Sequence, residues 1–160
     1  MNVSIATIER GGADYLAELH RLGANSLRLI VELTETAPVT DASAVLRFAS
    51  ACRANGFLIA LDDCAPDHPY GTAAFIENMR PELVKIDGKF LLKSFKSGDV
   101  EELRQLIDTA HHFKALVIAE HISSPELHQF ALSLGVNFVQ GFALGMPAPL
   151  PHRNAQPAFC

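Results

Sequence analysis

The sequence contains no tryptophan, few cysteines and no long apolar run. Its three cysteines, Cys52, Cys64 and Cys160, have neither C-x-x-C nor metal-site spacing, so we expect neither a disulfide framework nor a zinc knuckle. No apolar stretch approaches the roughly 18 residues that a membrane span needs, and the N-terminal residues do not form a secretory signal. These absences predict a chain without a membrane span that resides in a reducing cytoplasm.

Positive charge is also scarce. Lys and Arg number 13 against 18 Asp and Glu, which gives a net charge of −5, and no Lys/Arg run exceeds two residues. Because nucleic-acid binding relies on clustered basic residues, this composition argues against a nucleic-acid partner. The glycine-rich loops G-x-G-x-x-G and G-x-x-x-x-G-K-[ST] are absent too, so the glycine signatures of open nucleotide-binding sheets are missing.

The chain does contain an alternation of short β-type runs with longer helical ones. Its 160 residues, 49% of them apolar, suffice for one domain with a buried core. The expected strands are Asn2–Ile5, Leu27–Leu33, Phe57–Asp62, Leu83–Ile86, Ala115–Glu120 and Phe138–Gln140. The expected helices are Ala13–Leu22, Ala42–Asn55, Ala73–Met79, Val100–His112 and a segment from Ser124 to Gly135, with only a partial turn over Gly88–Phe95.

The strands are nearly continuous apolar runs, which is typical of parallel strands covered by helices. A repeated β-α unit leaves two architectures, the doubly wound sheet and the (β/α)8 barrel. Polar residues at the expected strand ends distinguish them, because barrel enzymes collect their functional side chains there. These residues are Glu32, Asp62, Asp63, Lys85, Asp87, Glu120 and Gln140, with Asn2 in the first strand.

A single carboxylate at a strand end most often caps a helix or faces solvent. Several carboxylates in one barrel mouth would repel one another without cations, and hard oxygen ligands suit Mg²⁺, Mn²⁺ or Ca²⁺. The adjacent pair Asp62 and Asp63 is the strongest indication of a metal site, since two neighbouring carboxylates can share one metal ion or bridge two.

Five segments in order resemble the EAL-domain family, the bacterial cyclic di-GMP phosphodiesterases. They are Glu-Leu-Thr-Glu at 32–35, Leu-Asp-Asp at 61–63, Val-Lys-Ile-Asp at 84–87, Ala-Glu-His at 119–121 and Gln-Gly-Phe-Ala-Leu-Gly-Met-Pro-Ala-Pro at 140–149. The resemblance implies a (β/α)8 TIM-type barrel over residues 1–150, with about six of its parallel strands present, and a Pro-rich tail over 151–160. It also implies that bound divalent ions, Mg²⁺ or Mn²⁺, activate water against a phosphodiester.

The resemblance further assigns roles to individual residues. The positions that match metal ligands are Asn2, Glu32, Asp62, Asp63 and Glu120. Lys85 matches the lysine that positions or polarises the attacking water, so Lys85 and Glu120 are the expected catalytic residues. Gln140 matches a ligand-binding amide, and Glu35 the carboxylate that steadies the loop after the paired aspartates.

The sequence departs from the family pattern in four places. The Glu-Ala-Leu segment, with its metal-binding Glu, and the first two strands have no counterpart. The usual Asp-Asp-Phe-Gly-Thr-Gly-Tyr loop is replaced by the residues at 62–71, which include two prolines. Ser123 stands where the family has a second Glu, and the end is rich in proline. Each departure predicts weaker metal binding and slower hydrolysis.

Three hypotheses therefore remain open at this stage. The first is an EAL-type module that binds cyclic di-GMP or a protein partner with little or no hydrolysis. The second is an active phosphodiesterase that forms linear pGpG when the missing N-terminal segment is supplied. The third is a remnant without an independent role. Since six strands leave open sheet edges, we also expect a second copy, a partner protein or the tail after Met146 to cover the edge at Asn2–Ile5.

Overall fold

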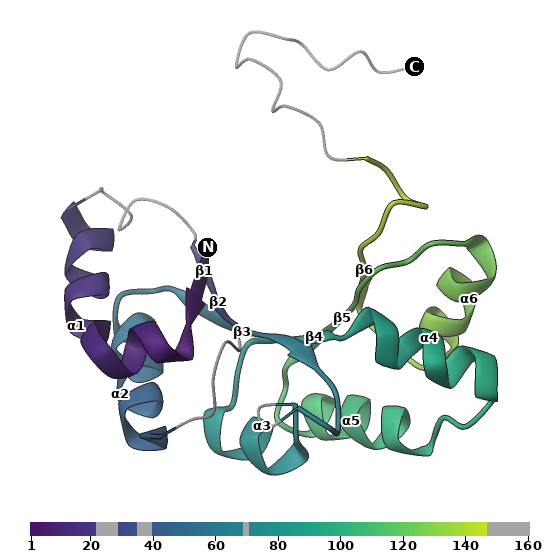
Figure 1. The fold of residues 1–160 in the computed structure, drawn as a ribbon, viewed down its shortest axis with the longest axis horizontal. Helices are drawn as coiled ribbons and strands as arrows, with labels where there is room; N and C mark the ends of the chain where they lie inside the picture. Colours follow the sequence, from purple (N-terminus) through teal and green to yellow (C-terminus); the bar gives the residue numbers. More distant parts are fainter. Residues whose placement is uncertain (22–28, 35–39, 69–70, 147–160) are drawn as a thin grey trace, which may run out of the picture.

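The computed structural model describes residues 1–21, 29–34, 40–68 and 71–146. Helices and strands alternate along most of the chain (Figure 1). The strands are β1 (Asn2–Ser4), β2 (Ile30–Thr34), β3 (Leu58–Cys64), β4 (Leu83–Ile86), β5 (Leu116–Ala119) and β6 (Phe138–Val139). The helices are α1 (Ile5–Arg21), α2 (Ala42–Ala54), α3 (Ala73–Met79), α4 (Gly88–Ser97), α5 (Glu101–His112) and α6 (Pro125–Ser133).

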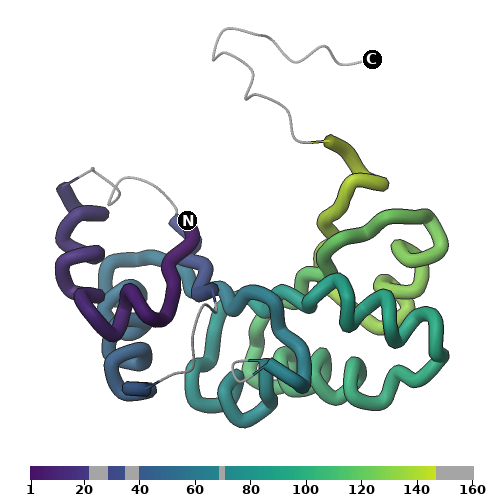
Figure 2. The backbone as a smooth tube through the Cα atoms, in the orientation of Figure 1, coloured from purple at the N-terminus to yellow at the C-terminus, as the bar shows by residue number. Residues whose placement is uncertain are grey.

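The six strands form one parallel sheet in the order β1-β2-β3-β4-β5-β6. The sheet is curved but not closed, and in Figure 2 the chain passes from a purple rim at β1 to a yellow-green rim at β6. This arrangement confirms the predicted α/β class and the six parallel strands of an incomplete barrel. None of the described helices is long and apolar enough to cross a membrane.

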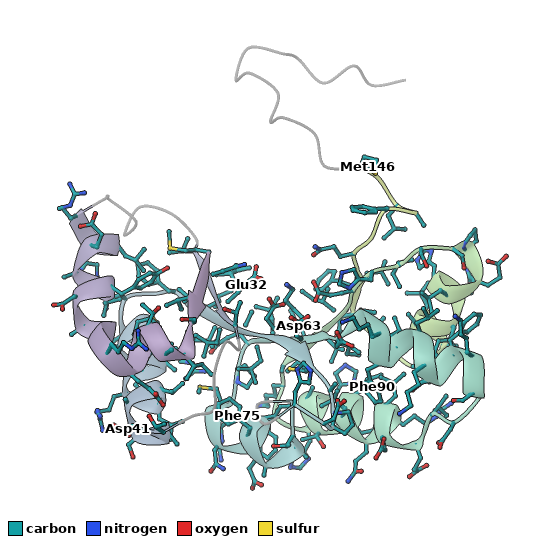
Figure 3. The ribbon with its side chains drawn as sticks, viewed as in Figure 1. Glu32, Asp41, Asp63, Phe75, Phe90 and Met146 are labelled. Atoms are coloured by element: carbon teal, nitrogen blue, oxygen red, sulfur yellow. The ribbon has the colours of Figure 1, made fainter. Side chains whose placement is uncertain are left out.

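Strand residues alternate between the two faces of the sheet, because the side-chain period of a strand is two. On β2, β3 and β4, the residues turned toward the helices are buried, among them Val31, Ile59 and Val84, none of which has measurable exposure. The side chains between them face the concave side, where no described helix lies across the sheet in Figure 1. Figure 3 shows Glu32 near this open side, whereas Phe75 lies among the helices beneath the sheet. The helix layer thus supplies the core and leaves the other face free for polar residues.

Two helices differ from the prediction. The first begins at Ile5 rather than Ala13, because the Ser4 hydroxyl accepts a hydrogen bond from the Thr7 N–H and caps a turn directly after β1. Gly11, with φ −169° and ψ 41°, then kinks this helix.

The predicted partial turn at Gly88–Phe95 was also wrong, since α4 is a complete helix. Asp87 caps its start by accepting from the Phe90 N–H at 2.7 Å, and Gly98 ends it with a left-handed φ of 74°.

Both rims of the sheet lack a neighbouring strand within the part of the chain that the structure describes. Three large apolar residues, Leu58, Leu116 and Phe138, begin β3, β5 and β6 and are 43%, 43% and 53% exposed. The tail from 147 to 160 lies outside the described residues, so the expectation that it or a partner covers the β1 edge stays a prediction.

Candidate metal and nucleotide site

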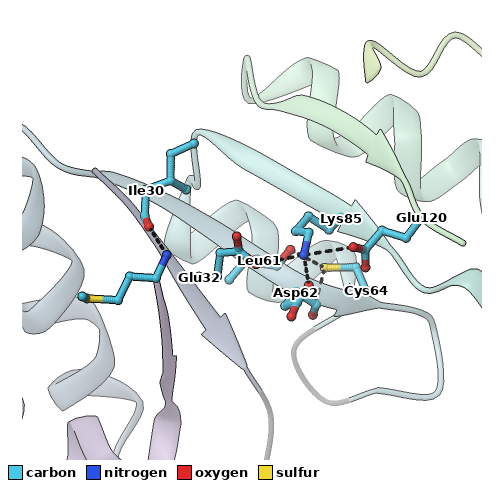
Figure 4. Close-up of polar contacts among 8 residues, drawn as sticks. Ile30, Glu32, Leu61, Asp62, Cys64, Lys85 and Glu120 are labelled. Carbon is cyan, nitrogen blue, oxygen red and sulfur yellow. Dashed lines mark hydrogen bonds and ion pairs between the residues drawn. The ribbon is translucent and has the colours of Figure 1, made fainter. Parts of the chain in front are cut away.

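Lys85 lies at the centre of the polar residues on the open face (Figure 4). Its Nζ donates hydrogen bonds to Asp62 Oδ1 at 2.6 Å and to Glu32 Oε2 at 2.8 Å, and it pairs with Glu120 Oε1 at 3.0 Å. The three carboxylates come from β2, from β3 and from the residue after β5, so four parts of the sheet meet at one ammonium group. The predicted convergence of these strand ends is thus present in the structure.

Asp62, Asp63 and Glu120 form a second, overlapping group. One carboxylate oxygen of each lies within 4.8 Å of the other two. Consecutive residues of a regular strand point to opposite faces, but the register between β3 and β4 shifts between Leu61 and Cys64. Asp63 also adopts a left-handed φ of 48°, so the backbone is irregular where the two adjacent carboxylates reach the same group. We call Asp62, Asp63 and Glu120 the carboxylate group.

Burial has the largest effect on the pKa values of Glu120 and Asp63. Burial raises the pKa of Glu120, and the nearby Asp62 and Asp63 raise it further, against the lowering effect of Lys85. Burial likewise raises the pKa of Asp63, together with the charges of Asp62 and Asp87. Burial alone would lower the pKa of Lys85, but its hydrogen bonds to Asp62, Glu32 and Glu120 outweigh that effect and raise it. The site therefore holds more negative charge than Lys85 offsets, and a divalent cation fits it.

Glu32 and Asn2, the other predicted metal ligands, lie on the neighbouring strands β2 and β1. Glu32 contacts Lys85 but is not a member of the carboxylate group. Asn2 is the register partner of Glu32 on β1, and its carbonyl accepts a hydrogen bond from the Tyr15 hydroxyl at 3.4 Å. Glu35 lies outside the described residues. The metal-binding roles of Asn2 and Glu32 and the role of Glu35 remain predictions.

Gln140 lies at the same end of the sheet as the carboxylate group. Its N–H donates to the Ala119 carbonyl at 2.9 Å, and its own carbonyl accepts from the Ile122 N–H at 3.0 Å. Its exposed side chain lines a groove of about 840 Å³ that also reaches Glu120. The groove runs between the start of α4 and the segments that follow β5 and β6. Other lining residues are Lys89, Leu92, His121, Ser123, Phe142 and Met146.

His121 was not among the predicted site residues, although it forms part of the groove wall beside Glu120. It adopts a left-handed φ of 54°, which is strained for a residue with a side chain. Its imidazole occupies the space that Gly88 leaves by lacking a side chain, since a Cβ on Gly88 would lie within 3.0 Å of His121 Nδ1. A sequence signal existed, because His121 directly follows the predicted site residue Glu120.

The loop that follows the paired aspartates begins in the core. Cys64 is fully buried, and its Sγ donates weakly to the Leu61 carbonyl at 3.8 Å. Burial, together with the charges of Asp62 and Asp63, raises the pKa of the Cys64 thiol, so this thiol stays protonated. The replacement of the family phenylalanine by Cys64 therefore provides a packing residue and no reactive group.

Comparisons with known proteins agree with this geometry. The family model described as the EAL domain matches residues 1–147. The chain is 31% identical over 124 residues to the Escherichia coli protein named cyclic di-GMP phosphodiesterase PdeF. This match covers 77% of the chain and 16% of PdeF, so the chain spans about a sixth of that relative's length.

Solved structures share the fold. A Bacillus subtilis protein, YkuI, with an EAL domain in complex with cyclic di-GMP and calcium, superimposes with a TM-score of 0.77 at 24% identity, covering 92% of this chain and 37% of YkuI. Klebsiella pneumoniae BlrP1, in a complex with manganese and cyclic di-GMP, gives a TM-score of 0.74 at 22% identity, covering 89% and 37%. These two structures of EAL proteins thus contain divalent ions together with cyclic di-GMP.

Proposed function

Because the chain belongs to the EAL-domain family, we propose that it binds cyclic di-GMP at the carboxylate group and the adjoining groove, with little or no hydrolysis of its own. The observation that carries this proposal is the position of the groove, which begins at Glu120 of the carboxylate group. A dinucleotide could place phosphate near the carboxylate group, through a cation, and a base against Phe142. Phe142 is 72% exposed and offers an aromatic face for stacking.

A divalent cation, Mg²⁺ or Mn²⁺, belongs to this proposal. Asp62, Asp63 and Glu120 would hold it, since their oxygens converge within 4.8 Å. When bound, such an ion lowers the pKa of a coordinated water and offsets phosphate charge. The choice between Mg²⁺ and Mn²⁺ is decided by titration with each ion.

The contacts of Lys85 support the proposal of weak hydrolysis. An ammonium group has three N–H donors, and three carboxylates lie within 3.0 Å of Lys85 Nζ. No donor is left to position an attacking water. Ser123, which lines the groove where the family has Glu, also offers no carboxylate.

Hydrolysis to linear pGpG is the second candidate function, expected when a further segment completes the site. It is favoured by the assembled set of Glu32, Asp62, Asp63, Lys85 and Glu120.

Two further proposals accompany both candidates. A partner protein or second copy covers the exposed apolar residues at the starts of β3, β5 and β6, and the chain acts in the cytoplasm, where the buried thiols of Cys52 and Cys64 stay reduced.

Calorimetric titration of cyclic di-GMP, with and without Mg²⁺ or Mn²⁺, tests the proposal when the same sample is then analysed for product. Saturable binding without product supports a binding module. Formation of linear pGpG that disappears in Asp62→Asn selects the phosphodiesterase instead. Absence of both binding and product refutes the two candidates together.

A further inference from the structure

Lys85 and the proposed divalent cation share ligands. Asp62 and Glu120 are two of the three members of the carboxylate group, and both also contact Lys85 Nζ. The Lys85 side chain is 10% exposed, and those of Asp62 and Glu120 are 13% and 9% exposed. Water therefore screens this set of charges only weakly.

Two roles for Lys85 toward the cation are physically distinct. As a positioning residue, it would hold Asp62 and Glu120 in place, and its removal would weaken ion binding, typically by about 10–100-fold. As a competing cation, it would repel the ion and engage its ligands, and its removal would strengthen ion binding.

The magnitudes favour competition. Repulsion between an ammonium group and a divalent ion is twice that between two unit charges at the same distance. The shared carboxylates place both cations within one small, poorly screened cluster. Orientation contributes less, because the bulge at Asp63 and the strand register already fix where these side chains begin.

We propose that Lys85 is a built-in counter-ion that stabilises the carboxylates of the site and lowers the site's affinity for a divalent cation. This inference rests on the ion site of the proposed function. It predicts opposite signs for two measurements on a Lys85→Met variant. The ion-free protein becomes less stable, because Glu32, Asp62 and Glu120 lose their shared partner. The ion binds more tightly, because the competing charge is gone.

Calorimetric titration of Mn²⁺ into the full chain, combined with thermal unfolding in a chelator, tests this inference without measuring turnover. We expect Lys85→Met to bind Mn²⁺ at least about tenfold more tightly than the wild type. Lys85→Arg keeps the charge and should bind Mn²⁺ like the wild type. Lys93→Met removes an exposed lysine on α4 and serves as the matched charge control, with unchanged affinity.

A second variant decides the matter if Lys85→Met does not fold. Lys85→Gln removes the charge and keeps an amide N–H that can donate to Asp62 or Glu120. It should still bind Mn²⁺ more tightly than the wild type. Unchanged or weaker Mn²⁺ binding in a folded variant that removes the charge, Lys85→Met or Lys85→Gln, overturns the counter-ion role. Failure of the proposed function is a different result, namely that cyclic di-GMP does not bind to the wild type or to the variants.

Discussion

Replacing Gly88 with alanine tests the wall of the groove at its tightest contact. Gly88 is the first residue of α4, and a Cβ there would lie within 3.0 Å of the Nδ1, Cβ and Cγ atoms of His121. Overpacking of this kind costs typically about 1–3 kcal/mol. The better helix preference of alanine returns at most about 0.5–1 kcal/mol, because Gly88 is the first helical residue. We therefore expect Gly88→Ala to lower the free energy of unfolding by up to about 2.5 kcal/mol.

The same substitution in a His121→Gly background provides the matched control. There the imidazole is absent, so only the helix preference of alanine remains, and Gly88→Ala should stabilise the protein by at most about 0.5–1 kcal/mol. His121→Gly by itself relieves a left-handed φ of 54°. A double-mutant cycle should thus give a coupling energy of about 1–3 kcal/mol between the two positions.

Urea unfolding followed by circular dichroism, in the presence of a chelator, measures all four free energies. Cyclic di-GMP titration of the same proteins reports on the groove, and Gly88→Ala should weaken binding because it displaces the imidazole from the wall. If Gly88→Ala costs the same free energy in both backgrounds, His121 does not occupy the space beside Gly88, and the described groove wall is incorrect.

Three further predictions concern charge, capping and assembly. Burial, with the neighbouring aspartates, raises the pKa of Glu120, so its ionised form destabilises the fold. Without metal, Glu120→Gln should therefore stabilise the protein above that raised pKa, and this gain should vanish as the pH falls below the ordinary value of 4.5, where Glu120 is neutral in the folded and the unfolded chain. Exposed Glu126→Gln should not gain stability, since a hydrogen bond from its own backbone lowers its pKa. Asp87→Ala removes the cap on the Phe90 N–H and should cost about 1 kcal/mol in urea unfolding. Phe138→Ser should reduce self-association or partner capture in light scattering if the exposed start of β6 is an interface, and unchanged association would contradict that role.

Much of the fold could be predicted because its causes are local. The nearly continuous apolar runs around Val31, Ile59 and Val84 indicate parallel strands whose outer face is covered by helices. The capping residues that begin helices, such as Asp87, are visible in the sequence as well. The helix at Gly88–Ser97 was nevertheless underestimated, since its buried face is sparse and its stability depends on contacts with α5 and α6.

The sequence alone also predicted which residues lie at the strand ends. Glu32, Asp62, Lys85 and Glu120 end or follow apolar runs, and parallel strands bring such ends to one edge of the sheet. Their identity and approximate place needed no tertiary information.

Only the tertiary structure decided which of these residues touch. Lys85 binds Asp62, 23 residues away, and Glu32, 53 residues away. Asp63 joins Asp62 and Glu120 only because the register shifts between Leu61 and Cys64. Pairings of this kind depend on strand register and on the bulge, which are fixed by packing between distant segments, and no local pattern of residues specifies them.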